Sequence, residues 1–344
     1  MKNKLTVAVI GAGRIAGGYD ENKRSGEKGI YTHAGAYSAS GKFILKTVFD
    51  IDRQRAGAFS AFWRVKRVAD SMEDIYGDSH DVVSVCTPDE THFEIVKELV
   101  NHRCCKTIFI EKPLALRLAE IDELSTLAEA NGIALVVNFQ RRHDPVHHEL
   151  RSTIEARRKD LLAANAYYMK GLNHIGVTMI DTVTYLCGYP KSVLAYNRVY
   201  NQQVREFSYE FVLFYDGFNV SVKTTDSARF DYNYHLFELD LLFADGRITI
   251  LDNSRQVREC KTTGYAYSGV KVLNDRAARY RKTQYPTSMV EAVGYLYQIT
   301  RGKVPHVLNT PTASYNNRLI IEKVLQSYSE NCATLSFKEE EWKR

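Results

Sequence analysis

The first fifty residues place the strongest constraint on the fold of this chain. An apolar run at residues 5–10 leads directly into the glycine-bearing segment GAGRIA at 11–16, and a second apolar run at 43–49 ends at Asp50. This order predicts a strand, a glycine turn, a helix, a second strand and a terminal acid. It is typical of the βαβ unit that binds dinucleotides.

Each residue of the segment at 11–16 has an expected role in holding a dinucleotide. Gly11 permits a tight turn, and Gly13 has no side chain to block the approach of a pyrophosphate. Ala16 is small enough for the helix to pack on the strand. The helix start at Arg14 and Ile15 offers backbone N–H groups and a partial positive charge to the phosphates.

Asp50 supplies the acid that such units place beside the adenosine ribose. Its charge favours NAD over NADP, although Arg14, Arg53 and Arg55 keep NADP as an alternative. Asp50 lies well beyond the usual spacing of about 20 residues after the glycines. The excess fits the polar segment 21–31, which we interpret as a surface loop. The alternative is a flap near the cofactor or a basic site for an anionic substrate.

Length, charge and cysteine pattern narrow the class of protein. A chain of 344 residues predicts two domains. The net charge of +5 is spread along the sequence, which argues against a nucleic-acid partner and is compatible with an anionic small substrate. No apolar run approaches the ~20 residues that span a bilayer, so we expect no membrane partner and interpret the segment after Lys4 as a strand rather than a signal peptide. The six cysteines form no CxxC pair, which predicts free thiols in a cytoplasmic protein.

Residues 1–140 alternate between predicted strands and helices. Strands are predicted at 5–10, 43–49, 81–86, 107–110 and 133–137, and helices at 53–63, 92–100 and 118–130. This alternation predicts a Rossmann domain with a doubly wound parallel sheet. Because the carboxyl ends of parallel strands meet at one edge, we expect Thr87, Pro88, Glu111, Lys112 and Asn138 near the glycine turn.

Residues 141–344 have a different pattern, rich in tyrosine and β-branched residues. Strands are predicted at 161–168, 192–200, 207–215, 219–224, 235–243 and 247–250, and helices near 288–300 and 313–327. Asp216-Gly217 and Asp245-Gly246 are hairpin-turn signals. We therefore expect an α+β domain built on an open, mostly antiparallel sheet, with a role in substrate binding and oligomerisation.

Taken together, these landmarks resemble the glucose–fructose oxidoreductase / inositol dehydrogenase / MocA (Gfo/Idh/MocA) family of sugar and polyol oxidoreductases. The shared motifs are GAGRIA at 11–16, Thr87-Pro88 with His92, Glu111-Lys112-Pro113, Arg141-Arg142 before Asp144-Pro145, and Gly176 with Asp181. The resemblance covers nearly the whole chain. It implies cofactor contacts from Thr87, Pro88, His92, Glu111 and Lys112, and a homodimer or homotetramer formed through the second sheet.

The resemblance also implies that Lys112 is catalytic. A lysine there can hydrogen-bond the reacting substrate oxygen and stabilise its developing negative charge. In relatives the lysine–proline bond is often cis, which Pro113 permits. The alternative is a solvated lysine at the start of a helix.

The second catalytic element departs from the family pattern Asp-x-Gly-x-His-x-x-Asp. Residues 174–181 have the sequence HIGVTMID, so that His174 replaces the first aspartate, Thr178 replaces the catalytic histidine, and Asp181 remains. Because threonine is no general base near neutral pH and histidine is, we hypothesise that His174 abstracts the proton. Thr178 and Asp181 would then orient the substrate or the helix. The alternative is a packing or capping role for His174 in a weak or altered catalyst.

The remaining candidates are weaker. Arg142 and Asn173 are expected to contact substrate together with Lys112, His174 and Thr178. His143, His147, Asp144 and His148 have a possible metal spacing, but Asp144-Pro145 predicts a helix start, so no metal is expected.

The sequence as a whole predicts an NAD-dependent oxidoreductase. Its expected substrate is a secondary hydroxyl, or the matching ketone, of a sugar, with a nucleotide sugar or related carbohydrate of bacterial glycan metabolism favoured. The substrate is expected between the nicotinamide, Lys112 and residues 174–181. An inositol or polyol dehydrogenase is one alternative, and a non-catalytic regulator that binds NAD and sugar is another.

Overall fold

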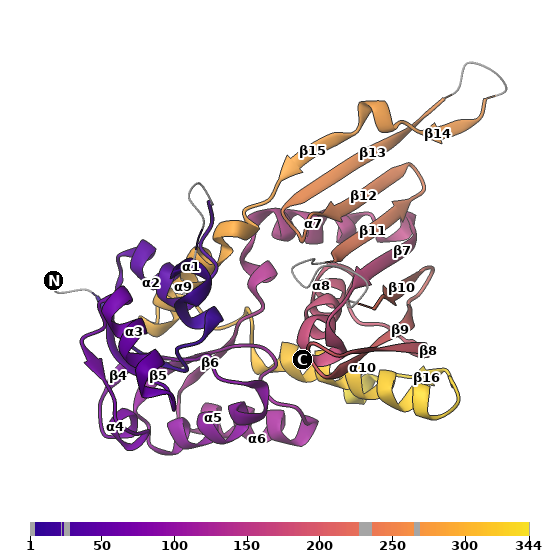
Figure 1. The fold of residues 1–344 in the computed structure, drawn as a ribbon. Coiled ribbons are helices and arrows are strands. Elements are labelled where there is room, and N and C mark those ends of the chain that lie inside the picture. Colours follow the sequence, from indigo (N-terminus) through magenta and orange to yellow (C-terminus); the bar gives the residue numbers. More distant parts are fainter. Residues whose placement is uncertain (1–3, 22, 24–27, 227–235, 265–268, 344) are drawn as a thin grey trace. The chain divides into compact units, whose positions relative to one another are not determined.

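The computed structural model describes residues 4–21, 23, 28–226, 236–264 and 269–343, and they form two compact units (Figure 1). The first unit comprises Met1–His143 and Tyr285–Tyr315, and the second comprises Asp144–Gln284 and Asn316–Arg344. The division expected after residue 140 leaves out the return of Tyr285–Tyr315 to the first unit. The physical reason for this return is helix α9 (Ser288–Thr300), whose apolar side is buried in the core of the first unit.

The described part of the first unit is built on a six-stranded parallel sheet. Its strands, in spatial order, are β3 (Arg67–Val68), β2 (Phe43–Phe49), β1 (Leu5–Ile10), β4 (His80–Val85), β5 (Cys105–Ile110) and β6 (Ala134–Val137). This order is that of the Rossmann fold. The chain adds β2 and β3 on one side of β1 and then crosses over to place β4, β5 and β6 on the other side. The predicted doubly wound sheet is confirmed.

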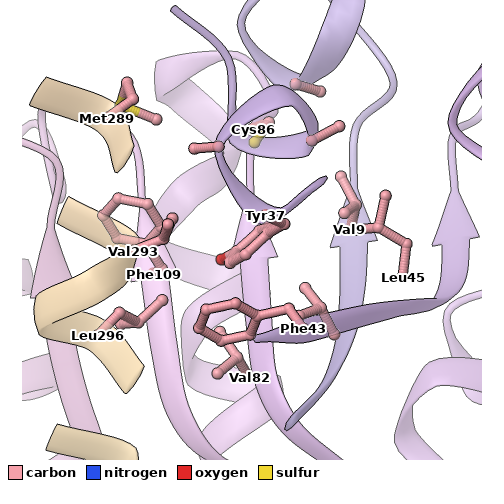
Figure 2. Packing of buried hydrophobic residues seen from close by; sticks show 14 of the residues in the cluster. Val9, Tyr37, Phe43, Leu45, Val82, Cys86, Phe109, Met289, Val293 and Leu296 are labelled. Atoms are coloured by element: carbon pink, nitrogen blue, oxygen red, sulfur yellow. The ribbon is translucent and has the colours of Figure 1, made fainter. Parts of the chain in front are cut away.

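One face of this sheet is covered by α2 (His33–Ser40), α3 (Arg53–Trp63) and α9. Figure 2 shows Tyr37 and Phe43 in the same apolar cluster as Val293 and Leu296 of α9. Phe109 of β5 joins this cluster and is fully buried. The contact between α9 and the sheet explains why a segment about 180 residues further along the chain belongs to this core.

Helices α5 (His92–Asn101) and α6 (Leu118–Ala130) pack on β4, β5 and β6. Their buried residues include Val96, Leu99 and Leu124, none of which is exposed to solvent. A short helix, α4 (Glu73–Tyr76), precedes β4. Helices on both faces explain why the parallel strands are nearly continuous apolar runs.

The segment between the glycine turn and β2 differs from the expected single helix. A π-helical turn at Arg14–Gly18 is followed by α1 (Tyr19–Glu21), and residues 22 and 24–27 of the predicted loop lie outside the described residues. The chain then forms α2, which begins after Thr32. The carboxylate of Asp20 accepts hydrogen bonds from the Thr32 backbone N–H (3.0 Å) and hydroxyl (2.6 Å), which ties the start of α2 to the end of the first turn.

The second unit is built on a ten-stranded mixed sheet in its described part. The strands follow the order β14 (Lys271–Leu273), β13 (Gln256–Gly264), β12 (Gly246–Leu251), β11 (Phe237–Phe243), β7 (Leu161–Tyr168), β10 (Asn219–Thr224), β9 (Glu206–Phe214), β8 (Ser192–Asn201) and β16 (Leu335–Ser336), with β15 (Arg279–Lys282) beside β13. Strands β7 and β10 run parallel, and the neighbouring pairs from β9 to β8 and from β11 to β13 run antiparallel. The predicted open, mostly antiparallel sheet is confirmed.

Three helices complete the second unit: α7 (Pro145–Ala156), α8 (Val177–Cys187) and α10 (Pro311–Ser329), whose first residues belong to the first unit. Along β7, Ala164, Ala166 and Tyr168 are buried, whereas Asn165 and Tyr167 on the opposite face are half-buried. This alternation shows that one face of the sheet is packed and the other is more open.

Candidate active site

The glycine turn lies at the carboxyl end of β1. Gly11 has φ +86, and a Cβ there would come within 2.8 Å of the Cys86 carbonyl oxygen, so the turn requires glycine. Gly13 has no atom within 4 Å of the position a Cβ would take, which leaves the backbone open to a ligand. Ala16 is fully buried, as expected for a residue at which the chain packs on the sheet.

The acid at the end of β2 is bonded to the glycine turn. Asp50 accepts hydrogen bonds from the backbone N–H of Ala12 (2.7 Å) and of Asp52 (2.8 Å), one on each carboxylate oxygen. The Arg55 guanidinium lies 3.5 Å from the same carboxylate. Each carboxylate oxygen has a second acceptor position, so Asp50 can hold the turn and still accept a bond from a ribose hydroxyl.

A pocket of about 740 Å³ opens beside this turn, within the range of about 300–1,000 Å³ that cofactor sites occupy. Of the residues predicted to bind cofactor, Gly11, Gly13, Asp50, Thr87 and Pro88 line it. Arg14, Ile15, Ala16, His92, Glu111 and Lys112 are not among its lining residues. The structure therefore brings together the predicted residues at the carboxyl ends of β1, β2 and β4.

The pocket also has lining residues that the sequence analysis misses. They include Ile51, Met72, Thr91, Glu94 and Ile95. Ile51 follows the acid directly and exposes 94% of its surface, which is unusual for an isoleucine. Its position next to Asp50 is the one sequence signal that indicates a role; the other four become neighbours only when α5 and the loop before α4 fold beside the turn.

His92 connects two of the predicted motifs. Its ring is fully buried, with Nδ1 2.6 Å from the Pro113 carbonyl oxygen and Nε2 3.0 Å from the Thr87 carbonyl oxygen. The Lys112–Pro113 bond is cis, as the resemblance predicts. His92 thus joins the loop after β4 to the loop after β5, and it holds the chain one residue beyond Lys112.

Glu111 is held from two sides at the end of β5. Its carboxylate accepts hydrogen bonds from His33 (2.9 Å) and from the Asn138 amide (2.6 Å). Burial raises the pKa of Glu111, but these two hydrogen bonds and the charges of His33 and Lys112 outweigh that effect and bring its pKa below the ordinary value. Glu111 is therefore an anion directly before Lys112.

A second carboxyl group, that of Asp89, lies near Lys112 in the 3-10 turn Asp89–Thr91 that precedes α5. Burial raises the pKa of Asp89 above its ordinary value, although the charges of Lys112 and His92 oppose the rise. The vicinity of Lys112 therefore contains one carboxyl group that favours ionisation and one that resists it.

In the second unit, the predicted residues Asn173, His174, Thr178 and Asp181 lie around the start of α8. Residues Gly171–Gly176 form a π-helical turn before α8, so His174 and Thr178 are not separated by one regular α-helical turn. His174 is exposed and Thr178 is half-buried. Asp181 is buried and accepts a hydrogen bond of 2.7 Å from the Asn317 amide of α10.

Asn173 is bonded within the second unit. Its side-chain amide donates to Glu206 (2.7 Å), and its side-chain oxygen accepts from Arg318 (2.8 Å). Both ends of the amide are thus engaged by side chains of β9 and α10. These bonds fix the turn that carries His174.

Several of the remaining candidates have structural partners. The Arg142 guanidinium lies over the Phe139 ring, 5.6 Å from its centroid. His143 is bonded to Asn309 (2.7 Å) and His147 to Asp144 (2.9 Å). Among the residues that the structure describes, no group of three or more histidine, cysteine, aspartate or glutamate side chains is arranged to hold a metal ion.

Two bulk features complete the description. All six cysteines are free, as predicted, and five of them are buried. Within the described ranges, no helix has both the length and the apolar character needed to cross a membrane.

The sheet order and the pocket beside the glycine turn define a dinucleotide-binding Rossmann domain. Residues 5–139 match the model of the Gfo/Idh/MocA family, described as an oxidoreductase family with an NAD-binding Rossmann fold. Over residues 5–139 the chain is similar to this oxidoreductase family, and the predicted resemblance is confirmed for this part of the sequence.

Relatives with named activities match somewhat less than half of the chain. A myo-inositol dehydrogenase of Streptomyces leeuwenhoekii is 32% identical over 154 residues, which are 45% of this chain and 42% of that protein. A myo-inositol 2-dehydrogenase of Thermotoga maritima is 26% identical over 152 residues, which are 44% of this chain and 41% of that protein. The matched segments thus span less than half the length of these relatives.

Solved structures extend the similarity of fold to the second unit. Levoglucosan dehydrogenase in complex with NADH and levoglucosan has a TM-score of 0.74 at 17% identity, covering 97% of this chain and 99% of that chain. GenD2 from gentamicin A biosynthesis, in complex with NAD, has a TM-score of 0.75 at 16% identity, covering 98% of this chain and 97% of that chain. At these identities the similarity shows the fold alone.

Proposed function

We propose that this protein is an NAD(H)-dependent dehydrogenase that oxidises a secondary hydroxyl of a sugar or polyol, or reduces the matching ketone. The observation that carries the proposal lies within the first unit. A cofactor-sized pocket opens at the carboxyl ends of β1, β2 and β4, and Glu111-Lys112-Pro113 follows β5, the next strand of the same sheet.

The residues of the pocket fit a nicotinamide dinucleotide. The open backbone at Gly13 would face the pyrophosphate, and Asp50 would accept a bond from the adenosine ribose. The exposed side chain of Ile51 offers an apolar surface for the adenine. When bound, the nicotinamide supplies the acceptor or donor of a hydride at the substrate carbon.

NAD is the proposed coenzyme because Asp50 places a carboxylate at the pocket wall. Arg55 also lines the pocket, and a guanidinium there is the group that would favour the 2′-phosphate of NADP. Titrating the protein with NADH and with NADPH, followed by coenzyme fluorescence, decides between them. Tighter binding of NADH is the expected result.

Lys112 is proposed to bind the reacting oxygen. As the hydroxyl loses its proton and its carbon loses a hydride, negative charge develops on that oxygen before the carbonyl forms. The Lys112 ammonium can donate a hydrogen bond to it and stabilise this charge.

His174 is proposed to accept the hydroxyl proton, since its imidazole is exposed and Thr178 cannot perform this step. Replacing His174 by alanine should lower kcat by about 10²-fold or more, the usual contribution of a general base. His102→Ala is the matched control, because His102 is an exposed histidine bonded to Glu98 on α5. Turnover of His174→Ala equal to that of wild type would show that another group takes the proton.

The substrate class is tested by a screen of coenzyme absorbance at 340 nm. Sugars, inositols and other polyols, and nucleotide sugars are offered with NAD and with NADP. The names of the relatives, inositol and levoglucosan dehydrogenases, support neutral sugars and polyols, whereas the prediction of a nucleotide sugar rests on the charge of the chain. Tight NADH binding without turnover across the panel would favour the non-catalytic regulator.

A further inference from the structure

A chain of buried hydrogen bonds crosses the first unit from α2 to Glu111. The hydroxyls of Tyr37 and Ser84 lie 2.7 Å apart, and the Ser84 hydroxyl lies 3.2 Å from His33 Nδ1. His33 Nε2 lies 2.9 Å from Glu111 Oε1, and the Asn138 amide nitrogen lies 2.6 Å from the same oxygen. These five residues come from α2, β4 and the ends of β5 and β6, and the four bonds that join them span 27 to 78 residues of sequence.

The chain ends at the Glu111 carboxylate. Glu111 accepts from His33 and from the Asn138 amide, and the other ring nitrogen of His33 faces the Ser84 hydroxyl. The Ser84 hydroxyl in turn faces the Tyr37 hydroxyl. Each of these buried polar groups therefore has a hydrogen-bond partner within the chain.

The location of His33 separates it from the coenzyme. His33 is fully buried and its ring packs on Phe109, with centroids 4.6 Å apart. It does not line the pocket beside the glycine turn. Its hydrogen bond to Glu111 is the contact that connects it to the residue directly before Lys112.

We propose that His33 is a positioning residue for Lys112, an inference that rests on the proposed function of Lys112. The backbone is held on both sides of this lysine. Before it, Glu111 is fixed by His33 and Asn138; after it, the Pro113 carbonyl is fixed by His92 at 2.6 Å. Since rate depends on sub-ångström placement of reacting groups, the loss of one of these anchors lowers turnover without touching the coenzyme site.

The test compares His33→Leu, His33→Gln and Tyr37→Phe with wild type. Leucine removes the donor to Glu111, whereas glutamine presents an amide N–H near the place of Nε2. Tyr37→Phe is the matched control, since it removes a buried hydroxyl of the same chain that does not touch Glu111.

We expect His33→Leu to lower kcat by about 10- to 100-fold. The Kd for NADH should stay within about twofold of wild type, because His33 does not line the coenzyme pocket. A twofold change in Kd equals about 0.4 kcal/mol. His33→Gln should recover most of the lost kcat, and Tyr37→Phe should keep the wild-type value. A merely structural role of His33 would not give rescue by glutamine.

A second measurement needs neither substrate nor coenzyme. Amide hydrogen exchange, followed by mass spectrometry, should rise in His33→Leu within residues 108–116 and stay unchanged in Tyr37→Phe. Should wild type lack turnover in the substrate screen, the proposed function fails while this measurement still tests the anchoring of the loop.

Two results would overturn the inference. One is wild-type kcat in His33→Leu with unchanged exchange at 108–116. The other is exchange that rises throughout the first unit, because His33 would then support the core rather than the loop that carries Lys112.

Discussion

The two glycines of the turn at 11–13 are required for different physical reasons. Gly11 is needed by the protein itself, because its φ is +86 and a Cβ would meet the Cys86 carbonyl at 2.8 Å. Gly13 has an extended backbone that any residue adopts, and no protein atom lies near the place of its Cβ. The fold itself therefore does not require glycine at 13, which supports the proposed pyrophosphate contact there.

Gly13→Ala should leave folding intact and weaken dinucleotide binding. A methyl group at 13 would enter the space that the pyrophosphate needs, so the Kd for NADH should rise by about tenfold or more, equal to about 1.4 kcal/mol. Coenzyme fluorescence gives the Kd and thermal unfolding gives the Tm. Gly57→Ala is the control: Gly57 lies in α3 with open space around it, so alanine should leave the Kd unchanged and raise stability slightly. Equal NADH affinity in Gly13→Ala and wild type would contradict this assignment.

Glu111 should contribute stability that depends on pH. Its pKa in the folded protein is below the ordinary value of 4.5, so its contribution is present above about pH 4.5 and is lost as the pH falls through the lower, folded pKa. In Glu111→Gln this contribution is absent. The Tm of wild type should therefore exceed that of Glu111→Gln at pH 6, and the gap should close as the pH is lowered toward 3. A gap that does not change with pH would show that Glu111 does not titrate in this way.

His33 illustrates which site residues a sequence cannot reveal. Lys112 and Pro113 are found because they form a contiguous motif, and Asp50 because it closes a strand. His33 lies 78 residues before Glu111 in sequence, and its chemistry appears only when α2 packs beside β4 and β5. Asp20 is a second example, because its hydrogen bond to Thr32 forms only when the folded chain places Thr32 beside it.

At the scale of elements, helices and strands with strong apolar patterns are predicted to the residue. Strand β2 at Phe43–Phe49, α3 at Arg53–Trp63, α6 at Leu118–Ala130 and α9 at Ser288–Thr300 have the expected bounds. Helix α2 is not predicted, because its sequence HAGAYSAS consists mostly of small residues that give little periodicity. Strands β14 and β15 are also missed, since KVL has only three residues and RYRK is short and mostly charged.

The start of α2 depends on one side chain. The Thr32 hydroxyl oxygen accepts from the Gly35 backbone N–H at 3.1 Å and its O–H donates to Asp20 at 2.6 Å. Thr32→Ala removes both bonds and should lower the free energy of unfolding of the first unit by about 1–2 kcal/mol. Thr32→Ser keeps the hydroxyl and should lose less than half of that. Thermal unfolding compares the three proteins, and an equal loss in both variants would rule out the capping bond as the cause.

At the scale of the whole molecule, the sequence predicts the two kinds of sheet but not the division of the chain between them. Helix α9 is predicted as a helix near the end of the chain, yet nothing in its own pattern indicates that it packs on α2, β5 and β6 of the first unit. Partner choice between apolar faces is set by the assembled surfaces rather than by local sequence.

The open face of the second sheet, with Tyr167 of β7 half-buried, supports the proposal of a homodimer or homotetramer. Light scattering tests this proposal by measuring the molar mass in solution, which should be two or four times the 39.3 kDa of one chain.

The most direct test of the account is the role of Lys112 in turnover with NAD. Wild type, Lys112→Met and Lys106→Met are compared by absorbance at 340 nm with the best substrate of the screen, and NADH binding is measured in each. Lys106 is an exposed lysine on β5, the strand that precedes Lys112, and it pairs with Asp81, so its variant is the control. We predict that Lys112→Met binds NADH like wild type and loses turnover by about 10²-fold or more, while Lys106→Met remains active. Wild-type turnover in Lys112→Met would contradict the account.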